Sequence, residues 1–173
     1  FFRYWWQTDK GLFAPKGGQN LSLRQFERQW KGGAPNDENL AAMAAEYRRK
    51  FSNKVVIASG EDVAFHSSWA FLCAGGSMPD LPRPTDAKLL TSLPKMQPWL
   101  ADSDKGIWAL REPGKQILVY GSSGAELDLS SESGAFRLNA INSRTGKVTP
   151  GSQIVQAGGK VILPGGVVWL TKE

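Results

Sequence analysis

The chain changes its hydrophobic pattern near its midpoint. An aromatic run at residues 1–6 predicts a buried strand, followed by a loop over 7–20. Apolar residues then recur at the helical period over 37–51, and residues 63–74 are apolar nearly all round, so both segments are predicted helices. The apolar run 54–59 between them is typical of a strand buried on both faces. Strand and helix signals in alternation predict an α/β segment.

From residue 106 onward, every predicted element is a short strand that a turn follows, and most of these turns contain glycine. Such strands are typical of a sandwich or barrel. The predicted strands are 107–111, 116–121, 126–129, 136–142, 153–156, 160–163 and 167–171. The proline-rich residues before them are too apolar for a free linker, so we expect Leu89 to Leu100 to pack against the first part.

These patterns predict three parts in an α+β chain. Residues 1–83 would form an α/β segment with the last β/α units of a TIM-type barrel, 84–105 a linker packed on it, and 106–173 a small all-β sandwich. The sandwich would begin between Asp102 and Gly106.

Composition excludes several classes of site. The 21 Lys and Arg residues and the 16 Asp and Glu residues are spread evenly along the chain, which argues against a nucleic-acid partner. His66 and Cys73 are each the only residue of their kind, so they cannot build a structural zinc site, and we predict no metal and no cofactor. No stretch is long enough to span a membrane as a helix.

The C-terminal strands carry a resemblance to a known family. The pattern runs through Trp108-Ala-Leu-Arg, Gln116-Ile-Leu-Val-Tyr-Gly, Ala125-Glu-Leu-Asp-Leu-Ser, Asn142-Ser-Arg-Thr-Gly-Lys and Leu163-Pro-Gly-Gly-Val-Val-Trp-Leu. It resembles the small β-sandwich that ends many bacterial glycoside hydrolases, including apiosidase-like ones, a domain also described as a collagen-binding domain of a collagenase. The family's usual aromatic residue and proline before the Arg-Thr-Gly turn are replaced here by Asn142 and Ser143.

Residues 1–83 resemble the final strands of a clan-A-type glycoside hydrolase barrel, where strand ends carry the chemistry. The resemblance implies that Glu61 is the nucleophilic carboxylate at the end of the seventh strand. Glu61 and Asp62 equally suit the start of a helix at Val63, where its dipole stabilises acids, and this alternative stays open. Hydrolysis also needs a second carboxylate about 5 to 10 Å away. The resemblance places it on an earlier strand, so this chain alone is expected to be inactive.

The first strand and its loop have the composition of a sugar-binding surface, because aromatic rings stack on sugars while amides and charged groups bond hydroxyls. Packing and loop solvation explain the same residues equally well. The candidate substrate-binding residues are Tyr4, Trp6, Asp9, Lys16, Gln19 and Asn20.

The resemblance predicts the C-terminal portion of a glycoside hydrolase-like, carbohydrate-active protein that acts on a polysaccharide in the periplasm or outside the cell. Its expected partners are a carbohydrate and upstream barrel strands, or another chain, that cover the first part. Two alternatives remain open: a non-catalytic module that binds carbohydrate or protein, and a structural or envelope protein with a hydrolase-like fold. The residues do not decide the substrate, the bond cleaved or the oligomeric state.

Overall fold

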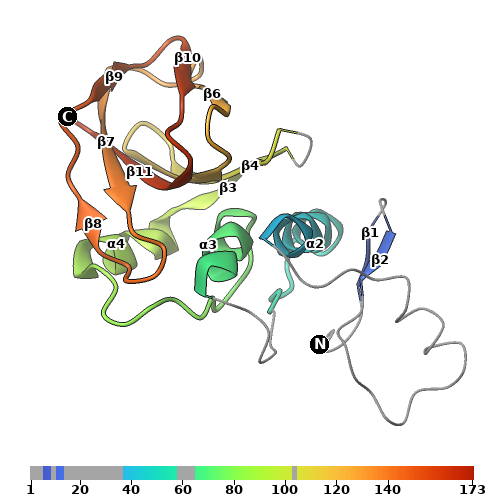
Figure 1. Cartoon of the computed structure of the whole chain (residues 1–173). Helices are drawn as coiled ribbons and strands as arrows, with labels where there is room; N and C mark the ends of the chain where they lie inside the picture. The colour runs from blue at the N-terminus through green and yellow to red at the C-terminus, as the bar shows by residue number, and fades with distance from the viewer. Residues whose placement is uncertain (1–5, 9–10, 14–36, 58–64, 103–104) are drawn as a thin grey trace, which may run out of the picture.

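The computed structural model describes residues 6–8, 11–13, 37–57, 65–102 and 105–173. The described part is mostly antiparallel β-sheet with a few short helices, and it forms a β-sandwich (Figure 1). The predicted β-sandwich is therefore confirmed. The prediction of an α/β barrel segment followed by a separate sandwich is wrong, for the reasons given by the elements below.

Helix α2 (Asp37–Lys50) occupies the predicted position. Its first turn carries Asp37 and Glu38 and its last turn carries three basic residues, so both ends complement the helix dipole. One face packs into the core through Leu40, Met43 and Ala44, which are buried.

Helix α3 (Phe65–Cys73) also lies where a helix was predicted. Its described residues, Ser68 to Cys73, are all buried. The helix ends at a Schellman-type cap, since the N–H of Gly75 donates to Leu72 and the N–H of Gly76 donates to Phe71. Gly75 has a φ of 92°, which glycine adopts without the strain of a side chain.

The described residues near the N-terminus form a hairpin. β1 (Trp6–Thr8) pairs antiparallel with β2 (Gly11–Phe13), and Trp6 stands opposite Phe13. The predicted loop from residue 7 to 20 therefore contains strand residues. Every strand pair that the described residues form is antiparallel, whereas a barrel of β/α units needs parallel strands.

The second strand predicted for the barrel is also wrong over its described residues, 54–57, which form no strand. Val56 is buried, but Val55 is 67% exposed. A single backbone hydrogen bond of 2.7 Å, from Ser77 to the carbonyl oxygen of Val56, holds this segment to the chain that follows α3. A short apolar run has too few periods to distinguish a buried strand from a partly buried loop, which explains the error.

The segment predicted as a linker contains three elements: helix α4 (Ala87–Ser92), the 3₁₀ helix η1 (Leu93–Lys95) and strand β3 (Gln97–Asp102). The predicted packing is confirmed, since Leu89 and Met96 are buried in the same core as α2 and α3. The predicted start of the sandwich is too late, because β3 already belongs to its large sheet. Pro98 is tolerated because β3 is an edge strand with an irregular register after it.

The seven strands predicted after residue 106 are all present. They are β4 (Ile107–Glu112), β5 (Gln116–Gly121), β6 (Glu126–Asp128), β7 (Ala135–Ile141), β9 (Ile154–Gln156), β10 (Lys160–Ile162) and β11 (Gly166–Lys172). A further short strand, β8 (Val148–Thr149), was not predicted.

The large sheet has the order β3-β4-β5-β11-β7-β8, and β9 pairs with another part of β7. β6 and β10 form a small second sheet. The last strand of the chain, β11, therefore lies in the middle of the large sheet, between β5 and β7.

Both faces of the large sheet are buried. On one face, Trp108, Leu118 and Trp169 pack with α2, α3 and α4 in a single core. On the other, Ile117 and Val168 pack with residues of the small sheet. The central strands accordingly show four buried residues in a row, as expected for a sheet covered on both sides.

Candidate functional site

The sequence-predicted site residues lie outside the described residues, with one partial exception. The backbone of Trp6 belongs to β1, but its side chain is not described. The predicted roles of all these residues therefore stay predictions. The residues concerned are Tyr4, Asp9, Lys16, Gln19, Asn20 and Glu61.

The most clearly built surface feature of the described part lies where the loop before α4 meets the turn between β7 and β8. The backbone N–H of Asp86 donates a 3.2 Å hydrogen bond to the carbonyl oxygen of Gly146. Gly146 has a φ of 67°, and a Cβ atom at this position would lie within 2.4 Å of Oγ1 of Thr85. Glycine therefore permits both the turn conformation and the close approach of the two segments.

The same turn is held from two further directions. Oδ1 of Asn142 accepts hydrogen bonds of 3.0 Å from the backbone N–H groups of Arg144 and Thr145. From the buried helix α3, Nε1 of Trp69 donates a 2.9 Å hydrogen bond to the carbonyl oxygen of Ser143. The backbone that carries the side chains of this turn is thus anchored to α3, to the loop before α4 and to itself.

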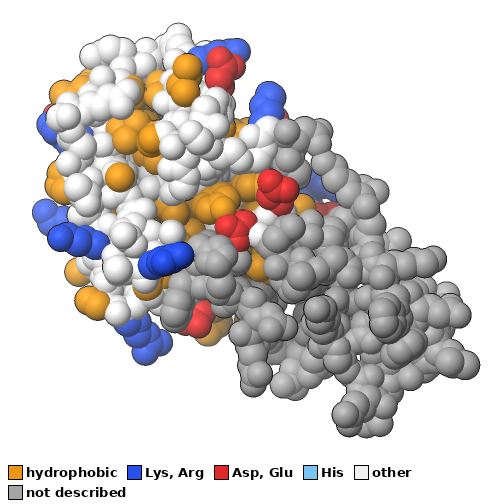
Figure 2. All heavy atoms as spheres, viewed as in Figure 1, with side chains coloured by type: hydrophobic (Ala, Val, Ile, Leu, Met, Phe, Trp, Pro, Cys, Tyr) orange, Lys and Arg blue, Asp and Glu red, His pale blue; other side chains and the backbone are white. Residues whose placement is uncertain are grey.

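Four cationic side chains surround this junction, and we call them the basic cluster: Arg83, Lys88, Arg144 and Lys147. All four are exposed. Each lies within two residues of Thr85, Asp86 or Gly146, so each Cα atom is within roughly 8 Å of the junction, given 3.8 Å between consecutive Cα atoms. Figure 2 shows blue side chains gathered over α4, β8 and the loop before α4, at the lower left of the molecule.

The basic cluster differs from most other basic residues in having no ion pair within the described part of the chain. Asp86, the acidic residue at the junction, accepts hydrogen bonds from the backbone N–H groups of Lys88 and Leu89 as the N-cap of α4. The ion pairs elsewhere are Lys50–Glu46, Lys105–Asp102, Arg111–Glu132, Lys115–Glu112, Arg137–Glu173 and Lys160–Glu126.

A second polar arrangement joins α2 to the sheet. The hydroxyl group of Tyr120 donates a hydrogen bond to Oδ2 of Asp37 in the first turn of α2. Burial raises the pKa of the Tyr120 phenol well above its ordinary value, and the hydrogen bond and negative charge of Asp37 raise it further. The phenol therefore stays protonated and acts as a donor that fixes the start of α2 on β5.

The aromatic residues of the sandwich serve the core, as the sequence pattern predicted for Trp108 and Trp169, which are buried. Nε1 of Trp169 donates a 3.1 Å hydrogen bond to Oε1 of Gln116. The amide nitrogen of Gln116 in turn donates to Glu112, which also pairs with Lys115. These hydrogen bonds leave the sandwich tryptophans enclosed and bonded within the protein.

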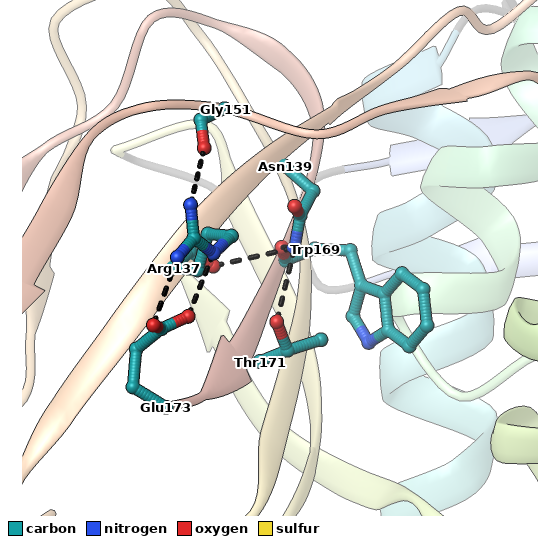
Figure 3. A network of polar contacts seen from close by, with 6 residues as sticks. All are labelled: Arg137, Asn139, Gly151, Trp169, Thr171 and Glu173. Atoms are coloured by element: carbon teal, nitrogen blue, oxygen red, sulfur yellow. Dashed lines mark hydrogen bonds and ion pairs between the residues drawn. The ribbon is translucent and has the colours of Figure 1, made fainter.

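A network at the end of the chain ties β7 to β11 (Figure 3). The guanidinium group of Arg137 donates two hydrogen bonds, of 2.7 and 2.8 Å, to the two carboxylate oxygens of Glu173 and a third to the carbonyl oxygen of Gly151. Beside it, the buried Nδ2 group of Asn139 donates to the carbonyl oxygen of Trp169 and to Oγ1 of Thr171. This network secures the central strand and carries no open surface.

The described residues contain no group of three metal-ligating side chains that could hold a metal ion. Cys73 is fully buried, and burial raises the pKa of its thiol, so it is not an activated nucleophile. Among the described helices, none combines the length and the apolar character needed to cross a bilayer.

Sequence reasoning missed the basic cluster because its members come from two segments about 60 residues apart. The available signal was indirect: Asn142 and Gly146 mark a tight turn that carries two cations, and Asp86 marks a helix start next to two more. Nothing in the local pattern indicates that the two segments meet.

The chain was also compared with known proteins. No curated protein matches it significantly. Residues 2–96 match the family described as "Domain of unknown function (DUF6298)", and this match includes α2, α3, α4 and η1 but ends before the large sheet. Because the matched residues make up more than half of the chain, the protein belongs to the DUF6298 family.

Proposed function

We propose that this chain is a module of a carbohydrate-active, glycoside hydrolase-like protein that acts on a polysaccharide in the periplasm or outside the cell. The observation that carries the proposal is the β-sandwich itself. The seven strands whose sequence resembles the terminal sandwich of bacterial glycoside hydrolases are all strands of the structure.

Within such a protein, the described residues suit a supporting or binding role better than hydrolysis. Hydrolysis requires two carboxylates that face each other across the bond to be cleaved. Several described carboxylates are instead committed to structure: Glu132 accepts hydrogen bonds from Arg111 and from the backbone N–H of Gly114, and Glu173 is paired with Arg137. Glu61 remains the candidate catalytic carboxylate, and its alternative role is to begin a helix.

The first experiment measures retention of the whole chain on a panel of soluble polysaccharides by affinity electrophoresis. We expect retention on at least one polysaccharide, and loss of that retention in the Tyr4→Ala and Trp6→Ala variants. Trp5→Ala is the matched control, since alternation along an extended segment places Trp5 on the opposite face. A chain that no polysaccharide retains would contradict the proposal.

A second experiment separates hydrolysis from binding. If Glu61 is the nucleophile, Glu61→Gln in the intact protein lowers glycosidase turnover by several orders of magnitude while retention on the polysaccharide is unchanged. Turnover close to that of the unmodified protein would remove Glu61 from the chemistry, and the binding role would stand without it.

A further inference from the structure

We propose that the basic cluster binds the carboxylate groups of an acidic polysaccharide built from uronic acid units. This inference rests on the proposed function, to which it adds the class of polysaccharide and the surface that recognises it. It comes from described residues alone and does not depend on Tyr4, Trp6 or Glu61.

The first argument is charge. Six basic side chains elsewhere in the described part are paired with carboxylates of the same chain, whereas Arg83, Lys88, Arg144 and Lys147 are exposed with no such partner. Four like charges around one junction repel one another, and an anionic partner removes that repulsion. The junction thus favours a ligand that carries several negative charges.

The second argument is the kind of cation. Arg83 and Arg144 come from the two different segments that meet at the junction, and each guanidinium group can bind a carboxylate through two parallel hydrogen bonds. Lys88 and Lys147 add point charges beside them. A polymer with a carboxylate on each unit can occupy several of these cations at once, and multivalent contact strengthens weak individual pairs.

The third argument is the rigidity of the base. The backbone under the cluster is fixed by the hydrogen bonds from Asp86 to Gly146 and from Trp69 to Ser143. Binding therefore orders only the side chains, and this lowers the entropy that the complex must lose.

The neighbouring residues favour a sugar over a nucleic acid or a membrane. The segments 82–88 and 142–147 contain no aromatic residue on which a base could stack and no large apolar residue that could enter a bilayer. They do carry hydroxyl groups, and Thr145 is exposed between the cations of the turn. Hydroxyl groups and cations together suit a carboxylated sugar.

The test uses the whole chain with two probes that differ only in charge: polygalacturonate, and the same polymer with its carboxylates methyl-esterified. We expect retention on polygalacturonate that weakens as salt is added, and little retention on the esterified polymer. The combined variant Arg83→Gln, Lys88→Gln, Arg144→Gln and Lys147→Gln should weaken binding by roughly tenfold or more, since each exposed pair contributes little alone.

The matched control removes four exposed positive charges elsewhere: Lys54→Gln, Lys105→Gln, Lys160→Gln and Lys172→Gln. It changes the net charge by the same amount, so we expect polygalacturonate binding within about twofold of the unmodified chain. Circular dichroism and thermal unfolding of both combined variants check that each is folded. All eight positions are exposed, so neither set of substitutions should disrupt the core.

Several results would overturn the inference. Equal losses in the two combined variants would show a response to net charge alone, and equally tight binding of duplex DNA or of anionic lipid vesicles at the cluster would show a different partner. Retention on neutral polysaccharides, unchanged by the cluster variant, would end this inference and leave the proposed function in place. Failure to bind any polysaccharide would end both.

Discussion

Nε1 of Trp69 lies 2.9 Å from the carbonyl oxygen of Ser143 and donates a hydrogen bond to it. The first residue belongs to α3, within the part that matches the DUF6298 family, and the second belongs to the turn after β7, outside that part. Together with the shared core of α2, α3, α4 and the sheet, this bond makes the family-matched residues one packed unit with the sandwich.

Trp69→Phe should destabilise the fold more than Trp108→Phe does. Both tryptophans are buried, at 0% and 1% exposure, so both substitutions remove similar apolar area. Nε1 of Trp108 has no hydrogen-bond partner, whereas Trp69 loses its bond to Ser143. We expect a difference of about 1 kcal/mol in the free energy of unfolding, measured in urea. Equal losses would show that the bond contributes nothing.

Gly146→Ala should weaken the junction that carries the basic cluster. The new Cβ atom would overlap Thr85, while the same substitution at Gly124 meets nothing within 4 Å. Both glycines have positive φ, so both variants share that strain. We expect Gly146→Ala to lower the free energy of unfolding by about 1 to 3 kcal/mol more than Gly124→Ala. Indistinguishable urea midpoints would mean that the two segments separate at little cost.

Leu89→Ala tests whether α4 is part of the core. Leu89 is fully buried, and its neighbour Leu90 is 44% exposed, so Leu90→Ala is the matched control on the same short helix. We expect Leu89→Ala to cost about 2 to 5 kcal/mol of unfolding free energy and Leu90→Ala less than about 1 kcal/mol. Similar small costs at the two positions would restore the interpretation of this segment as a linker.

Acid should remove the contribution of Glu173 to stability. The hydrogen bonds and charge of Arg137 hold the pKa of this carboxyl below its ordinary value of 4.5. A carboxyl whose pKa is lowered by folding stabilises the protein above its ordinary pKa, and this stabilisation disappears as the pH falls through the lowered value. The Tm of the unmodified chain should therefore exceed that of Glu173→Gln near neutral pH and approach it in acid.

The control for the acid experiment is Lys172→Gln, an exposed neighbouring residue with no ion pair in the described part of the chain. Its Tm difference from the unmodified chain should not follow the titration of a carboxyl group. Added salt should reduce the effect of Glu173→Gln, because the Arg137–Glu173 pair is partly exposed. A Tm difference for Glu173→Gln that is the same at all pH values would contradict this assignment.

Local pattern alone predicted the elements that local physics decides. The helix at 37–50 follows from its apolar period and its charged ends, and the helix that begins at Phe65 ends at Gly75 because glycine accepts the left-handed cap. The seven predicted strands of the sandwich follow from short apolar runs between turns. The roles of Glu61 and of the predicted sugar-binding residues remain predictions from the sequence.

Tertiary structure decided what depends on contacts between distant residues. The run at 54–57 has a strand's composition, but it forms no strand, and Pro98 suggested a linker where an edge strand tolerates it. β11 lies between β5 and β7 because only there are both its faces covered. The basic residues are spread evenly along the sequence. Four of them meet at one junction because folding brings Asp86 to Gly146, a contact that no local pattern encodes.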